Sequence, residues 1–161
     1  AGKRVKCVQL YTAGFSESGE PEWAGVEREM ARVAREGGFR IIGPNCFGVY
    51  NPRHGISYGP FNVRPALGSI GLIVQSGGIM GKILEYGMVQ GLGFGKGVSI
   101  GNASDIGVAD FLEYLALDDE IKTIGLYLEG PRDTRRLLEV IRATSETKPV
   151  VAWKGGTAAA G

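Results

Sequence analysis

The 161-residue chain carries 18 basic and 17 acidic residues, a net charge of +1, and 43% of its residues are hydrophobic. This composition is typical of a soluble globular protein, and the length allows one core, or one domain with part of another. Nucleic-acid binding and membrane insertion are not expected, because the sequence shows no basic stripe with interleaved aromatics, no apolar run near the ~18 residues of a membrane span and no signal peptide. Cys7 and Cys46 form no CxxC pair and have no histidine cluster nearby, which argues against a metal site and predicts a cytoplasmic location.

The first half of the chain predicts only part of a domain. A strand is expected at residues 5–11, a helix from Pro21 to the Gly37-Gly38 pair, and a short strand at residues 40–43. Two strands and one helix cannot bury enough surface to be stable alone. We therefore interpret residues 1–55 as the C-terminal part of a domain whose beginning lies outside this chain. The expected core-facing side of the helix comprises Trp23, Val26, Met30, Val33 and Ala34.

A stretch without periodicity, rich in proline, follows from Asn51 to Leu67. We interpret it as a connection between domains, centred on residues 56–65. The second domain then covers residues 66–161.

From Gly68 onward strands and helices alternate regularly. Strands are expected at residues 69–74, 97–100, 123–128 and 150–153, and helices at residues 79–90, 108–117 and 134–145. This alternation, together with 27 glycines that suit tight turns, predicts an α/β fold with a parallel sheet. Ligands of such sheets bind at the carboxyl ends of the strands. Those ends hold residues 75–77, 101–105, 129–130 and 154–156.

The stretch Gly71–Gly81 predicts an anion site. It reads as a buried strand, a glycine turn and the start of a helix, where backbone N–H groups lack partners and the helix dipole is positive. Gly77 and Gly78 leave room for a phosphate, and Ser76 can cap the helix or donate its hydroxyl to an oxyanion. The alternative is that these glycines only form a tight corner.

Other candidate residues each support two interpretations. Glu129 ends a strand at the same edge of the sheet and could orient a histidine or a metal, or it could be a solvated loop residue. Asn102 and Asp105 could contact a ligand, but capping of the next helix is the favoured interpretation. His54, the single histidine, has no motif around it that predicts catalysis, and the thiol of Cys46 is more often a packing group than a nucleophile.

Five segments in consistent order resemble the nucleoside-diphosphate-forming acyl-CoA synthetases, relatives of the succinyl-CoA synthetase α subunit. The resemblance extends over essentially the whole chain. It implies a Rossmann-like CoA-binding domain followed by a flavodoxin-like, nucleotide-dependent ligase domain. The segments are GPNCFGVYNP at residues 43–52, QSGG at 75–78, GFGKGVSIGN at 93–102, DFLEYL at 110–115 and LYLEG at 126–130.

The resemblance also implies a reaction and roles for particular residues. In this family ATP or GTP, with Mg, phosphorylates a histidine, the phosphate passes to a carboxylic acid, and the CoA thiol attacks the acyl phosphate. Ser76 and Gly77 match the phosphate-binding helix start. Asn45 and Cys46 match the loop near the CoA thiol, and Glu129 matches the glutamate that contacts the phosphohistidine.

The departures from the family pattern predict that the chain is an internal piece of a larger protein. The segment with the phosphorylated histidine would follow residue 161, and the ATP-grasp region, on a further domain or a β-type subunit, is absent. Phe47 and Gly78 replace residues that the family more often fills with Leu or Pro and with Ala or Thr. We expect the chain to be inactive as a ligase alone and the whole protein to be an oligomer.

Two alternatives remain open from the sequence. A similar region occurs as a regulatory module of bacterial protein acyltransferases, in which the histidine can be lost. A flavin-binding module of flavodoxin type is the other, although no aromatic pair flanks a flavin-like loop.

Overall fold

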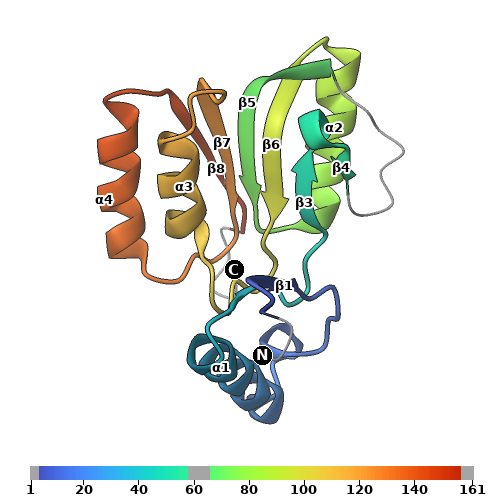
Figure 1. The fold of residues 1–161 in the computed structure, drawn as a ribbon, viewed down its shortest axis with the longest axis vertical. Helices are drawn as coiled ribbons and strands as arrows, with labels where there is room; N and C mark the ends of the chain where they lie inside the picture. Colours follow the sequence, from blue (N-terminus) through green and yellow to red (C-terminus); the bar gives the residue numbers. More distant parts are fainter. Residues whose placement is uncertain (1–3, 58–65, 157–161) are drawn as a thin grey trace.

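The structure, a computed structural model, describes residues 4–57 and 66–156. In these ranges the chain forms a larger unit, a six-stranded sheet with helices on both faces, and a smaller unit, a two-stranded parallel sheet beside one long helix (Figure 1). None of the described helices is long and apolar enough to cross a membrane. The elements are β1 (Cys7–Gln9), η1 (Ser16–Ser18), α1 (Pro21–Glu36), β2 (Arg40–Ile42), β3 (Gly48–Asn51), η2 (Pro52–His54), β4 (Ile56–Ser57), β5 (Ala66–Val74), α2 (Gly77–Val89), β6 (Gly93–Ser99), α3 (Val108–Ala116), β7 (Thr123–Leu128), α4 (Thr134–Ser145) and β8 (Val150–Lys154).

The larger sheet confirms the predicted α/β fold. Its strand order is β4-β3-β6-β5-β7-β8, and β6, β5, β7 and β8 are parallel neighbours. Strand β6 begins at Gly93, four residues before the predicted start. Glycines at this end allow a close approach of two backbones, because a Cβ atom at Gly95 would lie 2.7 Å from the carbonyl oxygen of Gly68.

Residues 48–57 differ from the prediction. Strand β3 pairs antiparallel with β6, with Gly48 opposite Ser99, and β4 pairs antiparallel with β3, with Asn51 opposite Ile56. The start of the predicted connection is therefore wrong, since these residues extend the larger sheet. The signal was missed because β3 has only four residues and its partner β6 lies far along the sequence. The rest of that connection, residues 58–65, lies outside the described residues.

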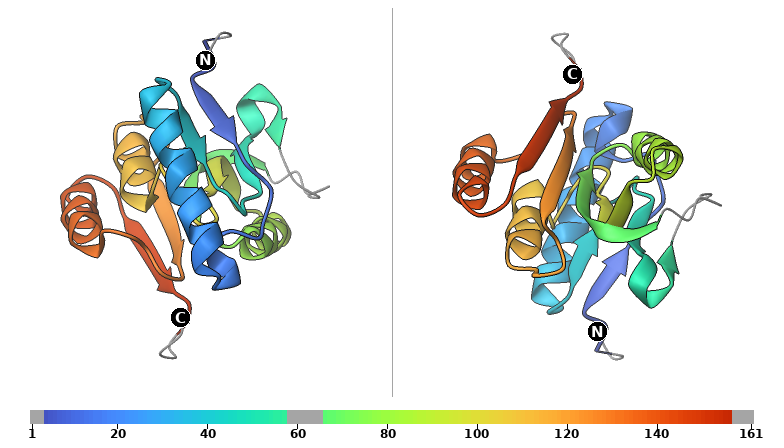
Figure 2. Two further views of the ribbon diagram at one scale, coloured as in Figure 1. Left: turned by 90° about the horizontal axis from the view of Figure 1, so that it is seen from below. Right: turned by 90° about the horizontal axis from the view of Figure 1, so that it is seen from above.

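The helices of the larger unit divide between the two faces of the sheet. Helix α2 lies on one face, and α3 and α4 lie on the other (Figures 1 and 2). The core under α2 contains Tyr50, Leu72, Val74, Met80, Leu84 and Phe94. The core on the other face includes Ile73, Val98, Ile100, Leu112, Ile124 and Leu126.

The smaller unit lies at the carboxyl ends of the strands of the larger sheet (Figure 1). Its predicted helix is present as α1, and Ala34 of the predicted core-facing side is buried, but most of that side is not. Trp23, Val26 and Val33 are exposed, whereas the buried residues are Glu27, Ala31 and Ala34. Small alanines allow the helix to approach the rest of the structure closely, and Glu27 has polar partners that the periodicity of apolar residues cannot reveal.

The loop between β6 and α3 joins the two units. Its backbone N–H groups donate to the smaller unit, from Ser104 to the carbonyl of Gly43 at 3.0 Å and from Ile106 to that of Ile41 at 3.2 Å. The Asp105 side chain, only 3% exposed, accepts hydrogen bonds from Arg40 Nε at 2.8 Å and from the Ile41 N–H at 2.9 Å. Asp105 therefore binds the two units together.

The interpretation of Asn102 and Asp105 as caps of α3 is wrong. The helix begins after Gly107, and the Asp110 carboxylate accepts the Gly107 N–H at 2.8 Å. Asn102 and Asp105 instead use their side chains on partners in the smaller unit. Those partners are more than 50 residues away in sequence, which is why the local pattern favoured a cap.

Candidate functional site

A cleft of about 330 Å³ lies at the carboxyl edge of the larger sheet, between the two units. The residues to which the sequence analysis assigned binding or catalysis all line this cleft, and they are Asn45, Cys46, Ser76, Gly77, Gly78 and Glu129. His54 does not line it, being exposed in η2. The cleft is also lined by Tyr11, Glu17, Phe47, Gln75, Gly101 and Asn102.

The N-terminus of α2 forms one wall of this cleft. Ser76 is the N-cap residue with extended backbone angles, and its Oγ accepts a long hydrogen bond of 3.5 Å from the Ile79 N–H. Gly77 and Gly78 are the first two helical residues, so their N–H groups have no acceptor within the helix. Because the helix dipole adds partial positive charge there, this wall suits an anion such as a phosphate.

The two glycines differ in their surroundings. A Cβ atom at Gly77 would lie 1.8 Å from Cδ2 of Phe47, whereas a Cβ atom at Gly78 would meet nothing within 4 Å. Phe47 thus packs directly on the start of the helix. Gly77 is needed for that packing, and Gly78 leaves the cleft open.

Glu129 directly follows β7, and its backbone is held by Gln75, the residue that directly follows the neighbouring strand β5. The Gln75 side chain oxygen Oε1 accepts hydrogen bonds from the N–H groups of Glu129 at 2.7 Å and Gly130 at 3.1 Å. The Gln75 N–H donates in turn to the Tyr127 carbonyl at 3.0 Å. The Glu129 residue is exposed, so its carboxylate is available to a ligand in the cleft.

Asn45 and Cys46 line the wall contributed by the smaller unit, and they differ in accessibility. Asn45 is exposed, has a left-handed backbone with φ of 56°, and donates from its side chain to the Asn102 side chain oxygen at 3.3 Å. Cys46 is 4% exposed, and its thiol donates to the Leu10 carbonyl at 3.3 Å. Burial raises the pKa of this thiol to about 11, so it stays protonated at neutral pH and is a poor nucleophile.

Sequence reasoning missed several residues of the cleft. Gln75 and Asn102 were placed at the correct edge of the sheet, but the pattern did not reveal what their side chains hold. Tyr11 and Glu17 carry no local signal, because the smaller unit meets the larger one only in the tertiary structure. For Gly101 the structure explains why the residue is a glycine, since its φ is +56° and a Cβ atom there would lie 2.1 Å from the Pro44 carbonyl oxygen.

Comparison with known proteins gives relatives over nearly the whole chain. The chain is 40% identical over 159 residues to the acetate–CoA ligase [ADP-forming] II subunit alpha of Pyrococcus furiosus, covering 99% of this chain and 34% of the relative. It is also 40% identical over 154 residues to the acetate–CoA ligase [ADP-forming] of Methanocaldococcus jannaschii, covering 96% of this chain and 21% of the relative. The chain therefore spans about a third or less of the length of these relatives.

Solved structures give the same picture. The dinucleotide forming acetyl-coenzyme A synthetase 1 of Ca. Korarchaeum cryptofilum superposes with a TM-score of 0.87 at 30% identity, over 97% of this chain and 34% of that one. That synthetase has also been solved in complex with phosphate and ADP. Residues 67–161 match the family described as succinyl-CoA ligase like flavodoxin domain, which is more than half of the chain. The chain therefore belongs to the family of succinyl-CoA ligase-like flavodoxin domains, as the sequence motifs indicated.

Proposed function

We propose that this chain is part of a nucleoside-diphosphate-forming acyl-CoA ligase, a larger protein that joins a carboxylic acid to CoA at the expense of ATP or GTP. The observation that carries the proposal is that three distant segments, with Asn45 and Cys46, Ser76 to Gly78, and Glu129, line one cleft. The identity of 40% to two proteins named as acetate–CoA ligases supports the reaction class.

In this proposal the N-terminus of α2 binds the phosphoryl group that is being transferred. The N–H groups of Gly77 and Gly78 and the hydroxyl of Ser76 supply donors at a partially positive helix end. Donors fixed by the fold stabilise a transferring phosphoryl group without reorganising during the reaction. The complex of the Korarchaeum synthetase with phosphate and ADP supports this class of ligand.

Glu129 orients the group that carries the phosphoryl. A carboxylate that accepts an imidazole N–H holds the ring in one orientation and one tautomer, as in hydrolase triads. The carrier in this proposal is a histidine from outside this chain, since His54 is exposed in η2 and does not line the cleft.

The smaller unit binds the reactive end of CoA. The side chain amide of Asn45 is exposed in the cleft and can hydrogen-bond the amide groups of the CoA arm. Cys46 contributes a packed wall and no nucleophile, because its thiol is buried and protonated. The Rossmann-like character of this unit is part of the proposal.

The described residues do not fit a Mg site of their own. Among residues 4–57 and 66–156 no group of three or more His, Cys, Asp or Glu side chains could hold a metal ion. We therefore assign Mg and the nucleotide to an ATP-grasp domain or β-type subunit, in an oligomer, and derive no step through the metal. A cytoplasmic location, also part of the proposal, rests on two cysteines that are both free thiols.

The proposal is tested in the full-length protein that contains this chain. Glu129→Gln should lower both acyl-CoA formation and the transfer of radiolabel from γ-labelled ATP to the protein by about 100-fold, the usual scale for losing one positioned electrostatic group. Glu146→Gln, an exposed change at the far end of α4, is the matched control and should have wild-type rates. Wild-type rates in the Glu129→Gln protein would overturn the role of this cleft.

A further inference from the structure

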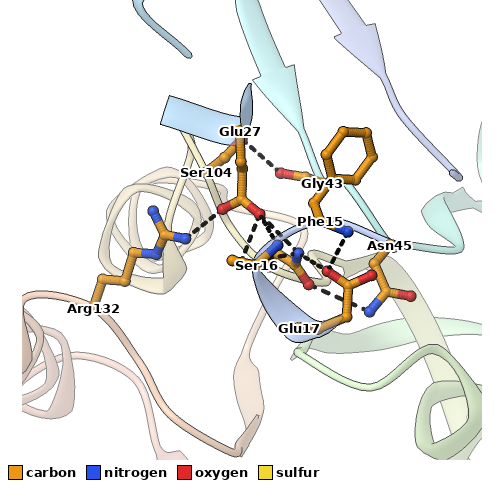
Figure 3. Close-up of polar contacts among 9 residues, drawn as sticks. Phe15, Ser16, Glu17, Glu27, Gly43, Asn45, Ser104 and Arg132 are labelled. Atoms are coloured by element: carbon orange, nitrogen blue, oxygen red, sulfur yellow. Dashed lines mark hydrogen bonds and ion pairs between the residues drawn. The ribbon is translucent and has the colours of Figure 1, made fainter. Parts of the chain in front are cut away.

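Glu27 is a buried carboxylate in the middle of α1, at the junction of the two units. The residue is 1% exposed, and a buried charge is costly unless donors surround it. Its Oε2 accepts hydrogen bonds from the Ser16 hydroxyl at 2.6 Å, the Ser16 N–H at 3.2 Å and the Asn102 side chain at 2.9 Å. Its Oε1 accepts one from Arg132 Nη2, so both oxygens have partners (Figure 3).

These donors bring together three segments that are far apart in sequence. Ser16 belongs to η1 of the smaller unit, Asn102 to the loop after β6, and Arg132 to the loop after β7. Burial by itself would raise the pKa of Glu27, but the hydrogen bonds from Ser16, Asn102 and Arg132 outweigh it and lower that pKa below its usual value. The carboxylate is therefore charged at neutral pH and holds its donors by charge-assisted hydrogen bonds.

Arg132 lies three residues after Glu129, in the loop that leads from β7 into α4. Hydrogen bonds hold this loop at both of its ends. Gln75 holds the N–H groups of Glu129 and Gly130, and Glu27 holds the Arg132 side chain. Glu27 also holds Asn102, which in turn accepts a hydrogen bond from Asn45 on the opposite wall of the cleft.

We propose that Glu27 is a positioning residue: it fixes the loop of residues 129–133, through Arg132, so that Glu129 faces Ser76 across the cleft. The inference rests on the proposed function of Glu129. Docking of the smaller unit does not depend on Glu27 alone, since Asp105 binds Arg40 and Ile41 and the backbones of residues 104 and 106 pair with the smaller unit. Loss of the Glu27–Arg132 pair therefore releases the loop while the two units stay together.

The test uses the full-length ligase with Arg132→Ala and Glu27→Gln. Each change should lower the rate constant for labelling of the protein by γ-labelled ATP about 10- to 100-fold, because a displacement of about 1 Å in a catalytic group has effects of that size. In Arg132→Ala the KM for CoA in acyl-CoA formation should stay within about threefold of the wild type, since Glu27 still holds Asn102 and Asn102 still holds Asn45. Arg132→Lys restores a charged donor and should recover most of the lost rate.

Two controls separate positioning from a general loss of structure. Arg135→Ala removes a 92% exposed arginine from the same helix end and should have no effect. In wild-type protein the Glu129 and Gly130 amides should exchange slowly with deuterium. In Arg132→Ala they should exchange at least about tenfold faster, while amides of α1 keep their wild-type rates.

The outcomes distinguish this inference from the proposed function. If Glu129→Gln is impaired while Arg132→Ala keeps the wild-type labelling rate and amide exchange, the positioning role is wrong and the function of Glu129 stands. If Glu129→Gln has full activity, the function of the cleft is wrong, and the positioning role falls with it. If both residues act in one step, the double variant Glu129→Gln with Arg132→Ala is no slower than Glu129→Gln alone.

Discussion

The side chain oxygen of Gln75 lies 2.7 Å from the backbone nitrogen of Glu129, so the residue after β5 holds the residue after β7 in place. The same oxygen also accepts the Gly130 N–H at 3.1 Å. One amide group thus defines the distance between the start of α2 and the loop that carries the candidate catalytic carboxylate.

The Gln75 bonds can be tested by Gln75→Leu, which keeps the size of the side chain but removes the acceptor. Two backbone N–H groups then lose their acceptor. We expect the free energy of unfolding, measured in urea, to fall by about 1–2 kcal/mol. Glu129 should become misplaced, so ligase activity of the full-length protein should fall about tenfold or more. Gln90→Leu, at the exposed C-terminal end of α2, serves as control and should change neither quantity. A Gln75→Leu protein with unchanged stability and rate would contradict this account.

The two glycines at the start of α2 should respond in opposite ways to alanine. Gly77→Ala forces a Cβ atom against the Phe47 ring and should destabilise the protein by about 1–3 kcal/mol. Gly78→Ala enters open space and gains helix propensity, so stability should stay constant or rise by up to about 1 kcal/mol. Denaturant unfolding of both variants measures the difference, and equal effects would show that Phe47 does not pack on Gly77 as described.

The raised pKa of Cys46 predicts a loss of stability at alkaline pH. Burial raises this pKa from 9.0 to about 11, so the folded state keeps its proton longer than the unfolded state. The contribution of the thiol to the free energy of unfolding is therefore complete below pH 9 and is lost as the pH rises through 11. The loss is at most roughly 2–3 kcal/mol. Urea unfolding at pH 8 and at pH 10.5 measures it.

The matched comparison removes each thiol in turn, because tyrosines and lysines titrate in the same range. Cys46→Ala should show a smaller loss of stability between the two pH values than the wild type. Burial also raises the pKa of Cys7, although this cysteine is exposed, so Cys7→Ala should remove part of the loss, but a smaller part than Cys46→Ala removes. Identical pH dependence in wild type and Cys46→Ala would mean that the thiol is not buried in solution.

Asp105 should be one of the more sensitive positions at the junction of the two units. Asp105→Ala leaves the Ile41 N–H without an acceptor and Arg40 without its partner. The free energy of unfolding should therefore fall by about 2–3 kcal/mol. Asp105→Asn keeps one acceptor oxygen and should cost less. Thermal unfolding compares these variants with Asp119→Ala, a change at an exposed aspartate. An effect of Asp105→Ala no larger than that of Asp119→Ala would contradict the role of Asp105.

The sequence by itself determined the fold class and the place of the candidate site. Hydrophobic periodicity predicted the strands and helices after Gly68, since most of these elements bury an apolar face or run, although β8 leaves Val151 and Trp153 exposed. The strand–glycine–helix pattern at Ser76 to Gly78 predicted the anion wall because backbone geometry there follows from local residues. The parallel sheet then placed Glu129 at the same edge.

The tertiary structure alone decided how the two units meet. Strand β3 joins the larger sheet through β6, which lies more than 40 residues further along the chain, so no local pattern could assign it to that sheet. Glu27 sits on a correctly predicted helix, but the periodicity put Trp23 and Val26 on its buried face. A buried carboxylate is stable only when donors converge on it, and its donors come from three segments between Ser16 and Arg132. That convergence, like the hold of Gln75 on Glu129, is a property of the folded chain and not of any one stretch of sequence.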